Sequence, residues 1–125
     1  RQTGLSSLRV DRTMKQFLFV IRTLEQNSRQ TQEGLDRILT VAAFDQTVNV
    51  LYLDDAVYRL STSQPESAAS LAAFELYDIR NIWVERESLL SRELDEACLP
   101  TGLQIIARNE IADLWAVHDV VLEAG

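Results

Sequence analysis

The sequence predicts an α/β fold, a three-layer sandwich in which helices cover both faces of a parallel sheet. Apolar segments of strand length alternate along the chain with segments of helical periodicity, and no hairpin signal joins two strands directly. The length of 125 residues and the hydrophobic fraction of 46% suit a single domain with a substantial core.

Five segments have the length and composition of strands. They are residues 17–21, 48–53, 81–84, 103–107 and 120–122. The first, FLFVI, is apolar without interruption, which is typical of a central strand that is buried on both faces.

The segments between these strands have helical periodicity. After a polar loop at 25–32, one apolar face is expected to consist of Leu35, Ile38, Leu39 and Ala42. A second helix is predicted over 67–77, with Ala68, Leu71, Ala72 and Leu76 facing inward. Residues 86–98 are predicted to be charged and partly helical. The last helix is predicted to have Asn109 as its N-cap and one face made of Ile111, Leu114, Trp115 and His118.

The first residues are expected to lie outside the domain. Met14 directly precedes the first predicted strand, so we interpret residues 1–13 as an N-terminal extension or an expression remnant. Residues 14–125 then form the single domain.

The composition disfavours several function classes. A formal net charge of −7 argues against direct binding to nucleic acid, which needs clustered Lys and Arg. No apolar run approaches the ~20 residues that a membrane-spanning helix requires. The single cysteine, Cys98, leaves no internal disulfide and fits a reducing cytoplasm. No glycine-rich loop follows the first strand, so no nucleotide cofactor is expected.

Asp54 and Asp55 follow the second predicted strand, at the edge of the sheet where α/β proteins place their ligands. Paired carboxylates at this position could bind Mg²⁺, as in a phosphoacceptor domain. That chemistry also needs a lysine late in the chain, and Lys15 is the only lysine. The favoured interpretation is that one aspartate caps a short helix starting near Ala56 while the other is solvated. No metal site is predicted.

Cys98 and His118 are the other candidates for catalysis. A persulfide-carrying thiol needs a nearby cation or a helix N-terminus to stabilise its thiolate. Cys98 has Asp95 and Glu96 nearby in the sequence, so a structural, partly buried cysteine is favoured. His118 has no Ser or Cys partner at a recognisable spacing and is expected to be structural, at a helix C-terminus.

Several short motifs, taken in order, resemble the DsrE/DsrF-like sulfur-relay family, and most closely its TusC/DsrF subunits. They are 33–36 (EGLD), 42–45 (AAFD), 53–60 (LDDAVYRL), Gln64, 76–79 (LYDI), 83–84 (WV) and 118–122 (HDVVL). The resemblance runs from about residue 15 to 122. It implies a five-stranded parallel sheet of order 4-3-2-1-5.

The resemblance also implies partners and a process. A TusC/DsrF-like subunit assembles with homologous TusB/DsrH-like and TusD/DsrE-like subunits into a two-fold hexamer. That hetero-oligomer passes persulfide sulfur between carrier proteins, either toward 2-thiouridine in tRNA or within sulfur oxidation.

The family's catalytic thiol follows the third strand of its active subunit, and Glu85 occupies this position here. A carboxylate cannot hold a sulfane sulfur. Two further departures from the family pattern concern glycines. Ala56 stands where a glycine is usual after the paired acids, and Glu93 stands where one often follows Arg92.

These observations predict a non-catalytic, cytoplasmic subunit of a sulfur-relay complex that acts in tRNA thiolation. No cofactor, metal, membrane contact or direct nucleic-acid contact is expected. The predicted partner contacts are Asp54, Asp55, Tyr58, Leu60 and Trp83. The alternatives are a sulfurtransferase that uses Cys98 as its own persulfide carrier, a DsrF-type subunit in sulfur oxidation, and a phosphoacceptor domain built on Asp54 and Asp55.

Overall fold

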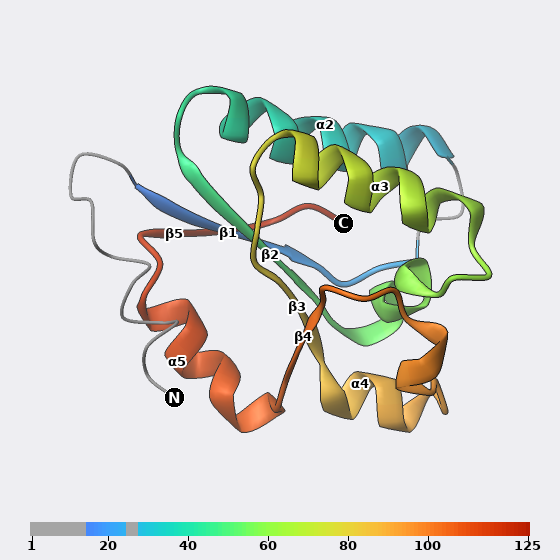
Figure 1. Ribbon diagram of the computed structural model, residues 1–125. Coiled ribbons are helices and arrows are strands. Elements are labelled where there is room, and N and C mark those ends of the chain that lie inside the picture. Colours follow the sequence, from blue (N-terminus) through green and yellow to red (C-terminus); the bar gives the residue numbers. More distant parts are fainter. Residues whose placement is uncertain (1–14, 25–27) are drawn as a thin grey trace.

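The computed structural model describes residues 15–24 and 28–125 of the chain (Figure 1). Its strands are β1 (Gln16–Ile21), β2 (Thr47–Tyr52), β3 (Ile82–Glu85), β4 (Gln104–Ile106) and β5 (Val120–Glu123). They form one sheet in the order β4-β3-β2-β1-β5, and every neighbouring pair is parallel. This confirms the predicted fold class and the strand order that the family resemblance implies, with every strand boundary within one residue of its prediction.

The helices lie on both sides of this sheet. They are α2 (Ser28–Ala43), α3 (Pro65–Leu76), α4 (Arg86–Ser91) and α5 (Ile111–Ala116), with short 3₁₀ helices η1 (Asp54–Leu60), η2 (Glu96–Cys98) and η3 (Arg108–Glu110). In Figure 1, α2 and α3 lie together above the sheet and α5 lies below it. Helix α4 follows β3 directly and packs against η1. Among the described residues no helix is long and apolar enough to cross a membrane.

The core has two layers because side chains alternate along each strand. In β1, Phe19 and Ile21 join the larger cluster beneath α2 and α3, which also contains Ile38 of α2 and Phe74 of α3. The alternate residues of the strand, Leu18 and Val20, join the second cluster with Leu114 of α5. A strand covered on both faces needs apolar residues at every position, which explains the uninterrupted run in β1.

Helix α3 turns a different face to the core from the one predicted. Leu71 does face the core, but Ala68, Ala72 and Leu76 are exposed, and the exposed fraction of Leu76 is 82%. The buried residues of this helix are Ser67 and Phe74. The Ser67 hydroxyl donates to the Leu60 carbonyl oxygen over 2.9 Å, and the Phe74 ring is fully enclosed. These two anchors fix the rotation of the helix, because small alanines offer little competing burial energy.

Three further local predictions were wrong. Helix α2 already begins at Ser28, within the predicted polar loop. Trp115 is half-exposed, although Leu114 on the same helix is fully buried. Asn109 is not the cap of the last helix. Instead, the Glu110 carboxylate turns back and accepts a hydrogen bond from the Ala107 N–H (3.1 Å). The interpretation of residues 1–13 lies outside the described residues.

Candidate functional site

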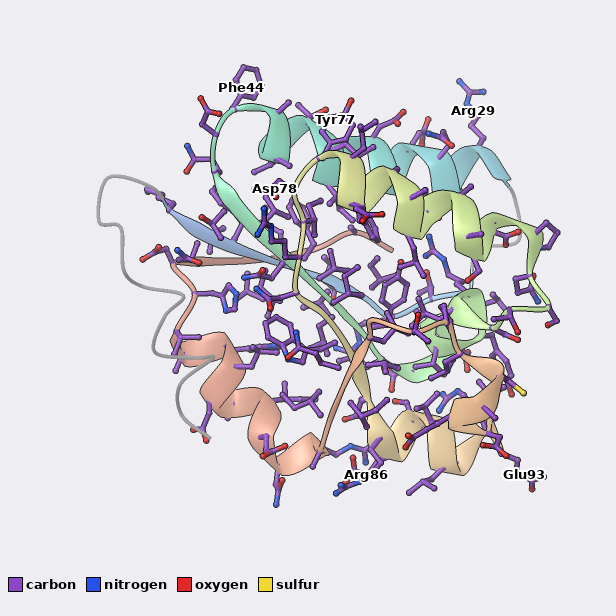
Figure 2. The ribbon with its side chains drawn as sticks, viewed as in Figure 1. Arg29, Phe44, Tyr77, Asp78, Arg86 and Glu93 are labelled. Carbon is purple, nitrogen blue, oxygen red and sulfur yellow. The ribbon has the colours of Figure 1, made fainter. Side chains whose placement is uncertain are left out.

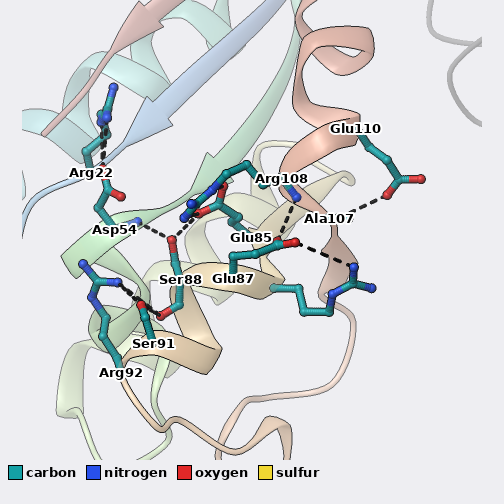
Figure 3. Close-up of polar contacts among 11 residues, drawn as sticks. Arg22, Asp54, Glu85, Glu87, Ser88, Ser91, Arg92, Ala107, Arg108 and Glu110 are labelled. Atoms are coloured by element: carbon teal, nitrogen blue, oxygen red, sulfur yellow. Dashed lines mark hydrogen bonds and ion pairs between the residues drawn. The ribbon is translucent and has the colours of Figure 1, made fainter.

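The carboxyl ends of all five strands carry charged side chains that lie in one row. In sheet order these are Arg108 after β4, Glu85 ending β3, Asp54 after β2, Arg22 after β1 and Glu123 ending β5. Ion pairs or hydrogen bonds connect each member to the next, with Ser88 completing the step from Glu85 to Asp54. Figure 3 shows the part of this row from Arg108 to Arg22. We call this row the strand-end chain. It occupies the edge at which open α/β sheets hold their functional groups.

Glu85 is the most firmly held member of the strand-end chain. Its side chain is only 4% exposed. Arg108 donates through Nε to Oε2 (2.9 Å) and through Nη2 to Oε1 (3.2 Å), which is a two-point guanidinium–carboxylate pair. The Ser88 hydroxyl donates a third hydrogen bond to Oε1. Three donors fix both carboxylate oxygens, so this side chain has a single orientation.

Ser88 links Glu85 to the turn after β2. While its hydroxyl donates to Glu85, the same oxygen accepts the Asp54 backbone N–H over 2.8 Å. Asp54 has a φ of 54°, a left-handed conformation that is costly for a residue other than glycine. Satisfying this N–H supports the strained turn. The first turn of α4 therefore holds two neighbouring strand ends together.

The electrostatics keep the Glu85–Arg108 pair ionised. Burial by itself would raise the pKa of Glu85. Hydrogen bonds from Arg108 and Ser88, together with the positive charges of Arg108 and Arg22, outweigh burial and lower this pKa below its ordinary value. The hydrogen bond from Arg108 to Glu85 and the charge of Glu85 raise the pKa of Arg108. At neutral pH the site holds a carboxylate and a guanidinium with no proton to exchange.

The paired aspartates are engaged by arginines. Asp54 accepts from Arg22 (3.0 Å), and Asp55 accepts from Arg92 (3.0 Å). Neither carboxylate caps η1, which begins at Asp54 and not near Ala56, so the capping interpretation was wrong. Within residues 15–24 and 28–125, no group of three His, Cys, Asp or Glu side chains comes together as a metal site would require.

Cys98 lies at the carboxyl end of its own short helix and not at the N-terminus of that helix. It is the last residue of η2, and its side chain is exposed, although a partly buried position was favoured from the sequence. Its carbonyl oxygen accepts from the Thr62 N–H (2.8 Å), and its own N–H donates to the Asp95 carbonyl oxygen. Asp95 also closes the turn by accepting the Ala97 N–H. The hydrogen bonds around Cys98 are therefore made by main-chain groups and by the Asp95 carboxylate.

His118 is part of a buried amide network at the opposite, amino end of the sheet. Its Nδ1 lies 2.7 Å from the Leu114 carbonyl oxygen, which can only accept, so Nδ1 carries hydrogen. Its Nε2 faces the Asn49 amide nitrogen at 2.9 Å. The Asn49 oxygen is engaged by Asn81, whose own oxygen accepts from Gln104. Because the Asn49 amide nitrogen can only donate, Nε2 of His118 accepts this hydrogen bond and carries no hydrogen, so the imidazole is neutral. The expected structural role is consistent with this geometry.

The predicted partner contacts divide into exposed and enclosed residues. Asp54, Asp55 and Tyr58 keep accessible surface. Leu60 has an exposed fraction of 1% and Trp83 of 7%, and the Trp83 ring meets His118 edge-to-face. A side chain already enclosed by its own chain has little surface to offer a partner. Leu60 and Trp83 therefore belong to the core of this chain, and a contact of any of the five residues with a partner stays a prediction.

A buried tyrosine lies beneath the strand-end chain. Burial raises the pKa of Tyr52 to about 12, opposed in part by the charge of Arg59. The phenol is therefore neutral at physiological pH and is not a nucleophile.

Sequence reasoning missed Arg22, Ser88 and Arg108. Each lies within three residues of the carboxyl end of a strand, and that position was the only available signal. Side-chain direction could not be read from spacing, so the convergence of these residues on Glu85 and Asp54 became visible only in the fold. Chemically, the site pairs carboxylates of this chain with its own arginines. It presents no thiol among the residues that the structure describes at the strand-end chain.

Comparison with known proteins gives the chain a family. The model of the DsrE/DsrF-like family matches residues 15–123. A protein named "Protein TusC homolog" from Vibrio parahaemolyticus is 30% identical over 107 residues, which are 80% of this chain and 91% of that protein. "Intracellular sulfur oxidation protein DsrF" from Allochromatium vinosum is 34% identical over 90 residues, covering 66% of each chain.

Solved structures agree with the fold. The ychN protein from E. coli superposes with a TM-score of 0.74 at 15% identity, covering 88% of this chain and 99% of that one. The protein MTH1491 from Methanobacterium thermoautotrophicum superposes with a TM-score of 0.73 at 11% identity, covering 87% and 98%. Both support the five-stranded architecture. Since the family model spans nearly all of the described residues, this chain belongs to the DsrE/DsrF-like family.

Proposed function

We propose that this protein is a subunit of a sulfur-relay complex that assembles and orients a thiol-bearing partner without carrying persulfide itself. Its similarity to a TusC homolog and to DsrF supports the relay. The main observation against a persulfide-carrying role is Glu85 at the end of β3. The family resemblance places the thiol of the active subunit at this position.

The chemistry at Glu85 supports this role. A persulfide carrier needs a sulfur atom that attacks a donor as a thiolate and is regenerated when the sulfur leaves. The Glu85 oxygens cannot do this, and three hydrogen bonds occupy them. The neighbouring Ser88 hydroxyl hydrogen points to a carboxylate and not to a histidine base, so it lacks the arrangement that activates a serine.

The partners in this proposal are a TusB/DsrH-like and a TusD/DsrE-like subunit, arranged as a two-fold hexamer in the cytoplasm. The complex then hands sulfur to separate carrier proteins, in the first place toward 2-thiouridine in tRNA. The name of the Allochromatium relative supports sulfur oxidation as the alternative process. The net charge of −7 disfavours direct contact with the tRNA phosphates.

Native mass spectrometry of the co-expressed subunits tests the assembly. We expect the chain alone to self-associate without fixed stoichiometry or to be poorly soluble, and to form one defined hexamer with its two homologous partners. A well-behaved monomer that ignores both partners would contradict the proposal.

Cys98 as an independent persulfide carrier is the competing hypothesis, and its exposed thiol is the one observation in its favour. Cys98 is the last residue of η2, so it does not lie at the N-terminus of that helix, where reactive cysteines are commonly found. Intact-mass analysis after incubation with a persulfide donor separates the two hypotheses. An added sulfur that disappears in Cys98→Ser would establish the enzyme.

A further inference from the structure

Helix α3 is apolar on its outer face as well as on its inner one. Its residues facing away from the core include Ala68, Ala69, Ala72 and Leu76, all of them exposed. A helix that is apolar all round is normally buried on both sides. In this fold the inner side meets the core through Phe74, while the outer side has no cover from the described part of the chain.

The end of α2 extends this apolar surface. Phe44, directly after α2, is 72% exposed, and Tyr77, directly after α3, is 41% exposed. Figure 2 shows Phe44 and Tyr77 on the side of the sheet that α2 and α3 cover. Ala43, Leu76 and Tyr77 line a single hollow between the ends of the two helices. We call this surface the α3 patch; its residues are Ala43, Phe44, Ala68, Ala72, Leu76 and Tyr77.

The border of the α3 patch is acidic. Four exposed carboxylates lie next to patch residues, either along the chain or in the lining of the neighbouring hollows. They are Asp45, Glu66, Glu75 and Asp78. Arg80, which lines the same hollow, is paired with Asp78 at 2.6 Å. A second copy of this chain would bring a second acidic border against the first, and juxtaposed like charges oppose association.

We infer that the α3 patch is the docking surface for a different protein chain, one that presents apolar side chains bordered by Lys or Arg. The inference rests on the proposed function and deepens it, because it names the surface by which this subunit joins a homologous partner. Its apolar centre with a charged border has the anatomy of a specific interface. Leu90 on α4 is also strongly exposed, lies apart from the α3 patch and serves as a matched control.

The test uses the full-length chain co-expressed with the TusB/DsrH-like and TusD/DsrE-like subunits. Phe44→Ser/Leu76→Ser removes the two most exposed anchors and should weaken the partner affinity at least about tenfold, because large apolar side chains dominate interface energies. Leu90→Ser should leave the affinity unchanged. Both variants alter exposed side chains, so their thermal midpoints should match that of the parent chain.

Two further measurements sharpen the assignment. Glu66→Lys/Glu75→Lys should also weaken assembly, most strongly at low salt, because it replaces attraction to a basic border by repulsion. In the parent complex, amide hydrogen exchange should slow over residues 65–77 relative to the chain alone.

Each contrary result has a distinct meaning. Normal assembly of Phe44→Ser/Leu76→Ser, or unchanged exchange over 65–77, would overturn the α3 patch while leaving the proposed function standing. A defined homodimer that this double substitution dissolves would show that the occupant is a second copy, which also overturns the inference. Failure of the parent chain to assemble at all would remove the proposed function and the inference with it.

Discussion

Arg108 donates hydrogen bonds to both carboxylate oxygens of Glu85, from Nε to Oε2 at 2.9 Å and from Nη2 to Oε1 at 3.2 Å. Glu85 ends β3 and Arg108 follows β4, so one ion pair ties these two neighbouring strands together at their carboxyl ends. The arginine is largely exposed while the glutamate is enclosed. Because water hardly reaches the Glu85 carboxylate, its charge is stabilised by Arg108 and Ser88 and not by solvent.

Replacing the Glu85 charge should lower the free energy of unfolding in a pH-dependent way. Glu85→Gln keeps the shape but weakens three hydrogen bonds to a charged group, a loss of roughly 1–3 kcal/mol at neutral pH. The folded-state pKa of Glu85 lies below the ordinary carboxyl value of 4.5. The carboxylate therefore contributes its full stability above about that pH and loses it as the pH falls through the folded-state pKa.

Urea unfolding of both proteins across the acid range measures this effect. The difference in unfolding free energy should be largest at neutral pH and should shrink below about pH 4.5. Glu96→Gln, at an exposed position, serves as the control and should differ little from the parent at any pH. A pH-independent loss for Glu85→Gln would mean that shape, and not charge, holds the site.

The turn after α4 has a geometry that suits the glycine expected there from the family resemblance. Glu93 has a φ of 55°, and the Leu94 N–H reaches back to the Leu89 carbonyl oxygen while the Glu93 N–H reaches Leu90. This is the Schellman arrangement, which favours glycine at the left-handed residue. Glu93→Gly should raise the unfolding free energy by about 0.5–1 kcal/mol in chemical denaturation.

At Ala56, the second position where a glycine was expected, a glycine should lower the unfolding free energy. Ala56 is fully buried and lies outside the left-handed region, which Asp54 occupies instead. Ala56→Gly should therefore lower the unfolding free energy by roughly 1 kcal/mol, since it adds chain entropy and removes buried carbon. Equal effects of Glu93→Gly and Ala56→Gly would contradict the assigned turn geometry.

Gly34 is required by close packing and not by its backbone angle. A Cβ at this position in α2 would lie 2.5 Å from the Ala124 carbonyl oxygen, which belongs to the main chain following β5. Alanine normally stabilises a helix interior by about 1 kcal/mol relative to glycine. Here the overlap should reverse the sign, giving Gly34→Ala a net destabilisation of about 1 kcal/mol or more.

Thermal and urea unfolding of Gly34→Ala check this prediction beside Gln32→Ala, an exposed site on the same helix. The control should stay within about 0.5 kcal/mol of the parent. A stabilised Gly34→Ala would show that the chain after β5 moves away from α2 at little cost.

The sheet was predictable because strand signals are local. An uninterrupted apolar run such as β1 demands cover on both faces wherever it lies, and the helical segments between the strands exclude hairpins. The rotation of α3 was not predictable in the same way. With apolar residues on every side, its periodicity selects no face, and the deciding contacts of Ser67 and Phe74 are made with distant parts of the chain.

The candidate site was likewise predictable only in part. Glu85 was identified through its position after the third strand, because the family resemblance marks that position. Arg22 and Arg108 lie 86 positions apart in the numbering, and both approach the same edge because of the strand order. No spacing rule relates such residues, and only the crossover connections bring them into one row.

The distribution of sulfur across the assembled complex tests the central claim most directly. The co-expressed subunits are treated with a persulfide donor, separated and weighed intact, for the parent chain and for Cys98→Ser. We predict an added sulfur on the thiol-bearing partner and none on this chain, with no change in Cys98→Ser. An added sulfur on this chain that Cys98→Ser abolishes would contradict the account.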